Sequence, residues 1–104
     1  MKFLIFRTEN DDVDQKGELV GVEYGAGIDD VTHKVICAIN DDLAARPENQ
    51  HCEIHTYAPD TLGSTLMQKL TTSPETRYEF MGVVAPLHSS QNILHPYLVV
   101  ASEY

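Results

Sequence analysis

The chain has 104 residues, of which 42% are hydrophobic and 22% are charged, a composition that suits one globular domain with a single core. Asp and Glu total 16 against 7 Lys and Arg, so the formal net charge is −9. Because the few basic residues are scattered, this balance argues against direct binding to nucleic acid and against attraction to an anionic membrane, whereas a basic or neutral protein remains a suitable partner.

The opening segment is expected to form a strand that is covered on both faces. Residues 2–8 are continuously apolar in their first half, which is typical of a strand, and residues 18–24 alternate well enough to be its hairpin partner. The polar stretch 10–17 between them is predicted to be a loop. The apolar run Phe3–Phe6 is too short for a signal peptide, and no stretch reaches the ~20 apolar residues of a membrane span, so we expect a cytoplasmic location.

Residues 29–46 are predicted to be a helix, although their β-branched residues would also suit a strand. Apolar residues recur every four positions, as on one side of a helix. They are Val31, Val35, Ile39 and Leu43. Asp29 or Asp30 is expected to cap the start, and Pro47 follows the end. Cys37 in this helix and Cys52 beyond it are expected to be buried thiols.

The second half of the chain predicts three more strands and a second helix. Strands are expected at residues 50–58, 77–85 and 97–102, with a loop at 86–96. The second helix would begin at Pro59–Asp60 and end before Ser73–Pro74. The fold class is therefore α+β over residues 1–104: a single-layer, mixed or mostly antiparallel sheet of about five strands with two helices, in the order ββαβαββ.

The candidate site residues are polar side chains on the 50–58 strand and histidines from the following loop. His51, Glu53, His55 and Tyr57 share one face of that strand, and the long loop adds His88 and His95. On a strand, His51 and His55 lie about 13 Å apart, too far to hold one metal ion by themselves. We therefore predict a ligand-binding set with no metal and no cofactor.

No catalytic motif is present, since the serines adjacent to His88 lack a nucleophile elbow and both cysteines are expected in the core, where a thiol is inert. The sequence favours a small acidic cytoplasmic binding or interaction protein, homo-oligomeric and most simply a homodimer. The alternative is a small enzyme or a ligand- or metal-binding domain with a pocket around Glu53, His55 and Tyr57. An acidic mimic of nucleic acid is a third hypothesis, which needs carboxylates spaced like phosphates.

Overall fold

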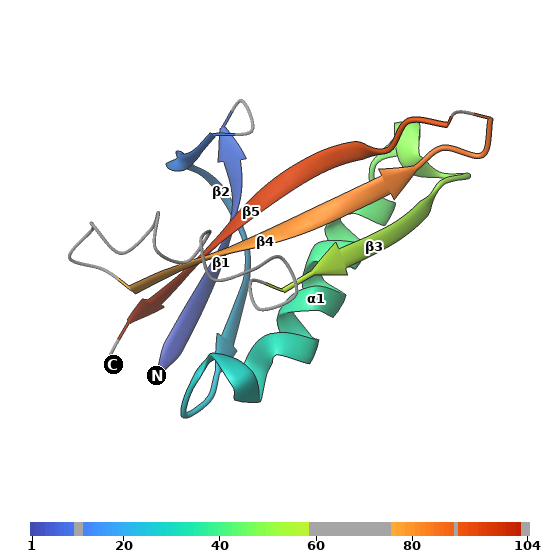
Figure 1. Cartoon of the computed structure of the whole chain (residues 1–104). Coiled ribbons are helices and arrows are strands. Elements are labelled where there is room, and N and C mark those ends of the chain that lie inside the picture. Colours follow the sequence, from blue (N-terminus) through green and yellow to red (C-terminus); the bar gives the residue numbers. More distant parts are fainter. Residues whose placement is uncertain (10–11, 59–75, 89, 103–104) are drawn as a thin grey trace.

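The computed structural model describes residues 1–9, 12–58, 76–88 and 90–102. These residues form one antiparallel five-stranded sheet with a helix packed on one of its faces (Figure 1). Along the chain the elements are β1 (Lys2–Glu9), β2 (Asp12–Tyr24), α1 (Ile28–Ala44), a 3-10 turn (Pro47–Asn49), β3 (Glu53–Tyr57), β4 (Thr76–Ala85) and β5 (Ile93–Ser102). The strands lie side by side in the order β2-β1-β5-β4-β3.

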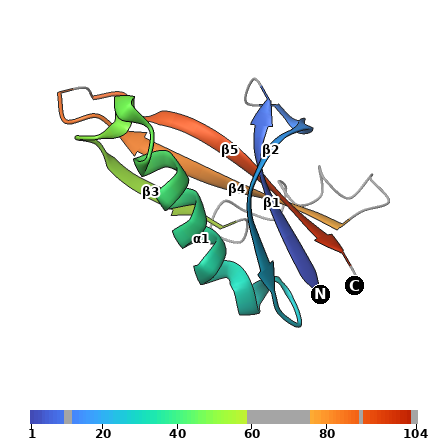
Figure 2. The ribbon, with the colours of Figure 1, turned by 180° about the vertical axis from the view of Figure 1, so that it is seen from behind.

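The predicted α+β class and the antiparallel sheet of about five strands are confirmed. The order of described elements is ββαβββ, with one helix where the sequence predicts two. The second predicted helix falls on residues 59–75, which lie outside the described residues. Seen from behind, α1 runs across the sheet from the β2 side towards β3 (Figure 2).

Helix α1 forms because its apolar stripe meets the sheet along its whole length. The four residues of the predicted stripe are fully buried. The start differs from the prediction: the N-cap is Gly27, and Asp30 caps from inside the helix by accepting the backbone N–H groups of Gly27 (3.1 Å) and Ala26 (3.2 Å). At the other end, the buried Asn49 donates to the carbonyl oxygen of Leu43 (3.0 Å), which also accepts the backbone N–H of Arg46 (3.2 Å).

Strand β2 is longer than predicted, because residues 12–17 pair with β1 and do not form a loop. Three shifts of register along β1 let this polar segment stay paired while its twist changes. Gly17 is required at this place: a Cβ atom there would lie 2.7 Å from the carbonyl oxygen of Arg7. The predicted loop at 10–17 is therefore wrong for the part that the structure describes.

Strand β5 also begins earlier than predicted, at Ile93 and not at Tyr97, so the predicted loop at 86–96 is too long. Pro96 has no backbone N–H to donate. The central strand tolerates it because the pairing of β5 with β1 ends at Tyr97, so no backbone hydrogen bond to β1 is lost at Pro96. The carbonyl oxygen of Pro96 still accepts the hydroxyl of Thr8 (2.9 Å).

The main core lies between α1 and the sheet. Its sheet residues include Phe3, Ile5, Phe80, Val84, Tyr97 and Val99. Gly82 in β4 lets the helix come close, since a Cβ atom there would lie 2.5 Å from Cδ1 of Leu43. A smaller cluster of Leu98 and Val100, with Phe6 packed against it, lies on the opposite face.

Candidate functional site

Strand β3 forms one edge of the described sheet, and its side chains alternate between the two faces as predicted. Ile54 packs against the core, and Thr56 donates its hydroxyl to the Asn40 side-chain oxygen of α1 (2.6 Å). The intervening residues Glu53, His55 and Tyr57 are exposed. The helix thus fixes one face of β3, while the opposite face presents exposed polar side chains.

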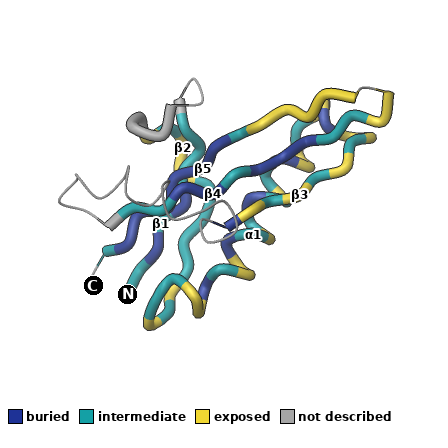
Figure 3. The backbone as a smooth tube through the Cα atoms, viewed as in Figure 1, coloured by how far each residue is buried: buried dark blue, intermediate teal, exposed yellow. Residues whose placement is uncertain are grey.

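Exposed apolar side chains also occur on β3 and around the hairpin of β4 and β5. Of the six large hydrophobic side chains that are exposed among the described residues, four belong to β3 or to the hairpin of β4 and β5. These four are Tyr57 (45% exposed), Leu87 (66%), Ile93 (49%) and Leu94 (53%), and we call them the hairpin-end surface. Leu94 lies on the sheet face of Tyr57, whereas Ile93 lies on the face of Ile54, so the set flanks the strands on both sides of the sheet. Figure 3 shows exposed stretches along β3, the hairpin tip and the beginning of β5.

Charge is sparse around the hairpin-end surface. Residues 46–58 and 76–102 contain two arginines and three glutamates, a net charge of −1, whereas the whole chain carries −9. The acids therefore concentrate elsewhere, for example at the exposed Asp29, Asp30 and Asp41 of α1. The segments that carry the exposed apolar side chains therefore hold few of the charges, as the centre of a protein interface tends to do.

A pocket of about 530 Å³ opens beside the hairpin tip. Its lining residues come from the 3-10 turn, the segment before β3 and the end of β4: Pro47, Glu48, Gln50, His51, Cys52, Pro86, Leu87 and His88. The structure thus brings together two of the predicted site residues, His51 and His88, which are 37 positions apart in the sequence.

The other predicted site residues lie elsewhere. Glu53, His55 and Tyr57 are not among the residues that line this pocket. His95 pairs with Gly82, which in turn pairs with Thr56, so His95 shares the face of Thr56 and lies on the other side of the sheet from His55. Across the described ranges, no group of three or more His, Cys, Asp or Glu residues is arranged to hold a metal ion.

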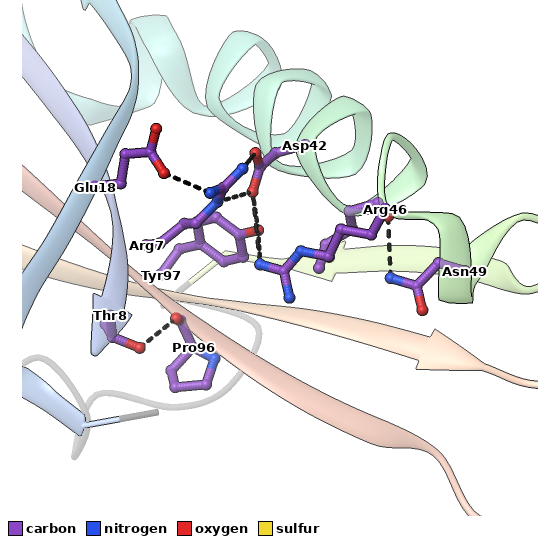
Figure 4. Close-up of polar contacts among 9 residues, drawn as sticks. Arg7, Thr8, Glu18, Asp42, Arg46, Asn49, Pro96 and Tyr97 are labelled. Atoms are coloured by element: carbon purple, nitrogen blue, oxygen red, sulfur yellow. Dashed lines mark hydrogen bonds and ion pairs between the residues drawn. The ribbon is translucent and has the colours of Figure 1, made fainter. Parts of the chain in front are cut away.

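A polar cluster that the sequence does not reveal joins α1 to the sheet (Figure 4). Asp42 of α1 accepts two hydrogen bonds from the Arg7 guanidinium of β1, one of them from Nε at 2.9 Å. It also accepts the hydroxyl of Tyr97 of β5. Arg46 donates to the Tyr97 hydroxyl oxygen (3.2 Å), and Arg7 also pairs with Glu18 of β2 (2.7 Å).

The environment of this cluster shifts the pKa values of its members. Burial alone would raise the pKa of Asp42, but the hydrogen bonds from Arg7 and Tyr97, with the charges of Arg7 and Arg46, outweigh it and lower that pKa. Burial and the hydrogen bond to Asp42 raise the pKa of Tyr97 well above its ordinary value. Asp42 therefore stays ionised and Tyr97 stays protonated, which makes the cluster a stabilising clamp between helix and sheet, with no group poised for proton transfer.

Tyr97 and the two cysteines are buried to different extents, and one further expectation is corrected by the structure. Tyr97, although it is a tyrosine, is only 1% exposed because the helix covers it. Cys37 was expected in the core, but it is exposed on the outer side of α1, since it lies next to the buried stripe and not within it. Cys52 is partly buried against the core.

Comparisons with protein-family models, with curated proteins and with solved structures give no match. The functional interpretation therefore depends on the geometry of this chain alone. None of the helical residues in the described ranges forms a segment that is long and apolar enough to cross a bilayer.

Proposed function

We propose that this chain is a small acidic binding protein that works as a homodimer, with two copies associating through β3 and the hairpin-end surface. The observation that carries the proposal is that four of the six exposed large hydrophobic side chains among the described residues lie on β3 or around the hairpin of β4 and β5. Two copies of a chain with a net charge of −9 repel each other, and the segments that carry these side chains, residues 46–58 and 76–102, contribute only −1 of that charge.

The edge strand supports the same proposal. In an antiparallel pairing of two β3 strands about a two-fold axis at His55, Glu53 of one copy faces Tyr57 of the other. No carboxylate then faces a carboxylate, and each Tyr57 hydroxyl can donate to the opposite Glu53. Among the described strands none pairs with the outer edge of β3, so a second copy could supply the missing backbone partners there.

Dimerisation through β3 and the hairpin-end surface would leave the acidic helix face open on both copies. Asp29, Asp30 and Asp41 are exposed there, and Glu18 of β2 is exposed on the strand at the far edge of the sheet. A surface of this kind attracts a basic protein by long-range electrostatics. We therefore propose a basic protein as the partner of the dimer.

Sedimentation velocity over a range of protein concentrations tests the dimer. The wild type should dimerise, and Tyr57→Lys or Leu94→Lys should raise the dimer Kd at least about tenfold, equivalent to roughly 1.4 kcal/mol. Leu19→Lys is a matched control, because Leu19 is 48% exposed but lies on β2 at the opposite edge of the sheet. A monomeric wild type, or equal weakening by Leu19→Lys, would overturn the proposal.

A further inference from the structure

A second feature of the molecule lies on the outer side of α1, away from the hairpin-end surface. His33 and Cys37 are one helical turn apart, and both are exposed. Nε2 of His33 lies 3.7 Å from Sγ of Cys37. We propose that these two side chains form a two-ligand site for a thiophilic divalent cation such as Zn²⁺.

The distance between the two donor atoms fits such an ion. Zinc binds thiolate sulfur at about 2.3 Å and imidazole nitrogen at about 2.0–2.1 Å, usually in tetrahedral geometry. Two donors at these distances and at the tetrahedral angle are about 3.6 Å apart. The observed separation of 3.7 Å therefore lets one ion contact both atoms without a change of the helix backbone.

The spacing explains why the two donors converge. Residues four apart on a helix are neighbours on its surface, which is how two histidines at this spacing bind zinc in helical metal sites. A helix also holds its ligands more rigidly than a loop does. In this chain α1 is anchored along its opposite side by the four fully buried residues of its apolar stripe.

The surrounding charge favours a cation. Asp29 lies four residues before His33 and Asp41 four residues after Cys37, so all four side chains follow one exposed line along the helix. Asp30 adds a third nearby carboxylate, although it is already engaged at the helix start. Lys34 is the opposing charge beside the pair, and the acids outnumber it.

Binding at this site would leave part of the coordination sphere open. No third His, Cys, Asp or Glu joins the pair in the described part of the chain, so water fills the remaining positions. The step is an exchange: a zinc–sulfur bond and a zinc–nitrogen bond form, two waters leave the ion, and the thiol proton passes to the solvent. We expect micromolar affinity and one ion per chain.

Titration of the reduced, metal-free protein with Co²⁺, followed by competition with Zn²⁺, tests the site. Thiolate coordination should give a sulfur-to-cobalt charge-transfer band in the near ultraviolet that saturates at one ion per chain and is abolished by added zinc. Cys37→Ser should remove this band, and His33→Ala should weaken binding at least tenfold. Both positions are exposed, so the far-ultraviolet circular dichroism of the variants should match that of the wild type.

Cys52→Ser is the matched control, because it removes the other cysteine and should leave the band unchanged. A band that depends on Cys52, or no band at all, would overturn the site. Saturation at one ion per two chains would show that a second copy supplies the remaining ligands. It would overturn the proposal that one chain binds the ion and water fills the other positions.

Discussion

Replacing Asp42 by alanine removes the acceptor at the centre of the clamp between α1 and the sheet. Arg7 is 36% exposed and can turn to water, so its share of the loss is about 0–1 kcal/mol. Tyr97 is buried, and its hydroxyl donor loses its acceptor, which costs about 1–3 kcal/mol. We expect a total loss of about 1–4 kcal/mol, and its midpoint of about 2.5 kcal/mol is equivalent to a fall in Tm of roughly 10–20 °C for a domain of this size.

The free energy of unfolding that Asp42→Ala loses should become smaller as the pH falls. The folded state lowers the pKa of Asp42 below its unfolded value of about 3.9. The stabilisation is therefore complete above the unfolded pKa and disappears as the pH falls through the folded pKa. Urea unfolding followed by circular dichroism should show a large difference between the wild type and Asp42→Ala at pH 7, and a smaller difference near pH 3.

Two further variants test whether the stability loss comes from the contacts of Asp42. Asp41→Ala removes an exposed carboxylate from the adjacent position and should change the free energy of unfolding by less than about 0.5 kcal/mol. Adding Tyr97→Phe to Asp42→Ala removes the orphaned hydroxyl and should recover about 1 kcal/mol. Equal losses for the two aspartates, or a difference that does not change with pH, would refute this account of the clamp.

Two other predictions concern the packing and the start of α1. Gly82→Ala should cost about 1–3 kcal/mol, because the new methyl group meets Leu43, and the double variant with Leu43→Ala should lose less than the sum of the single losses in urea unfolding. Asp30→Ala should cost about 1 kcal/mol by thermal unfolding, since the N–H of Gly27 loses its acceptor. Asp29→Ala, which removes only a helix-dipole contact, should cost clearly less; equal effects would contradict the capping role.

The elements that could be predicted from the sequence are those with a strong local period. The recurrence of apolar residues every four positions from Val31 to Leu43 predicts a helix and not a strand, and all four residues are buried in the structure. The alternation from Glu53 to Tyr57 correctly placed its polar residues on one face. The errors arose where long-range pairing outweighs local composition: residues 12–17 and Pro96 resemble loop residues, yet neighbouring strands hold them in the sheet.

The candidate sites were harder to predict, because they depend on residues that are distant in sequence. Asp42 and Tyr97 are separated by 55 positions, and neither carries a local signal of its partner. The sequence indicates both His51 and His88 as candidate ligand-binding residues, but only the fold shows that they line the same pocket. The exposed Cys37 could have been found, since it lies outside the apolar stripe of its helix and four residues from His33.

The position of β5 has a consequence for the order of folding. This strand comes last among the described elements, yet it lies between β1 and β4 and joins the β2–β1 pair to the β4–β3 pair. During synthesis β1 and β2 can form their local hairpin early, whereas the two halves of the sheet can join only after residues 93–102 have left the ribosome. Until then α1 has only half of its binding surface, so we expect its docking and the closure of the core to be a single late event.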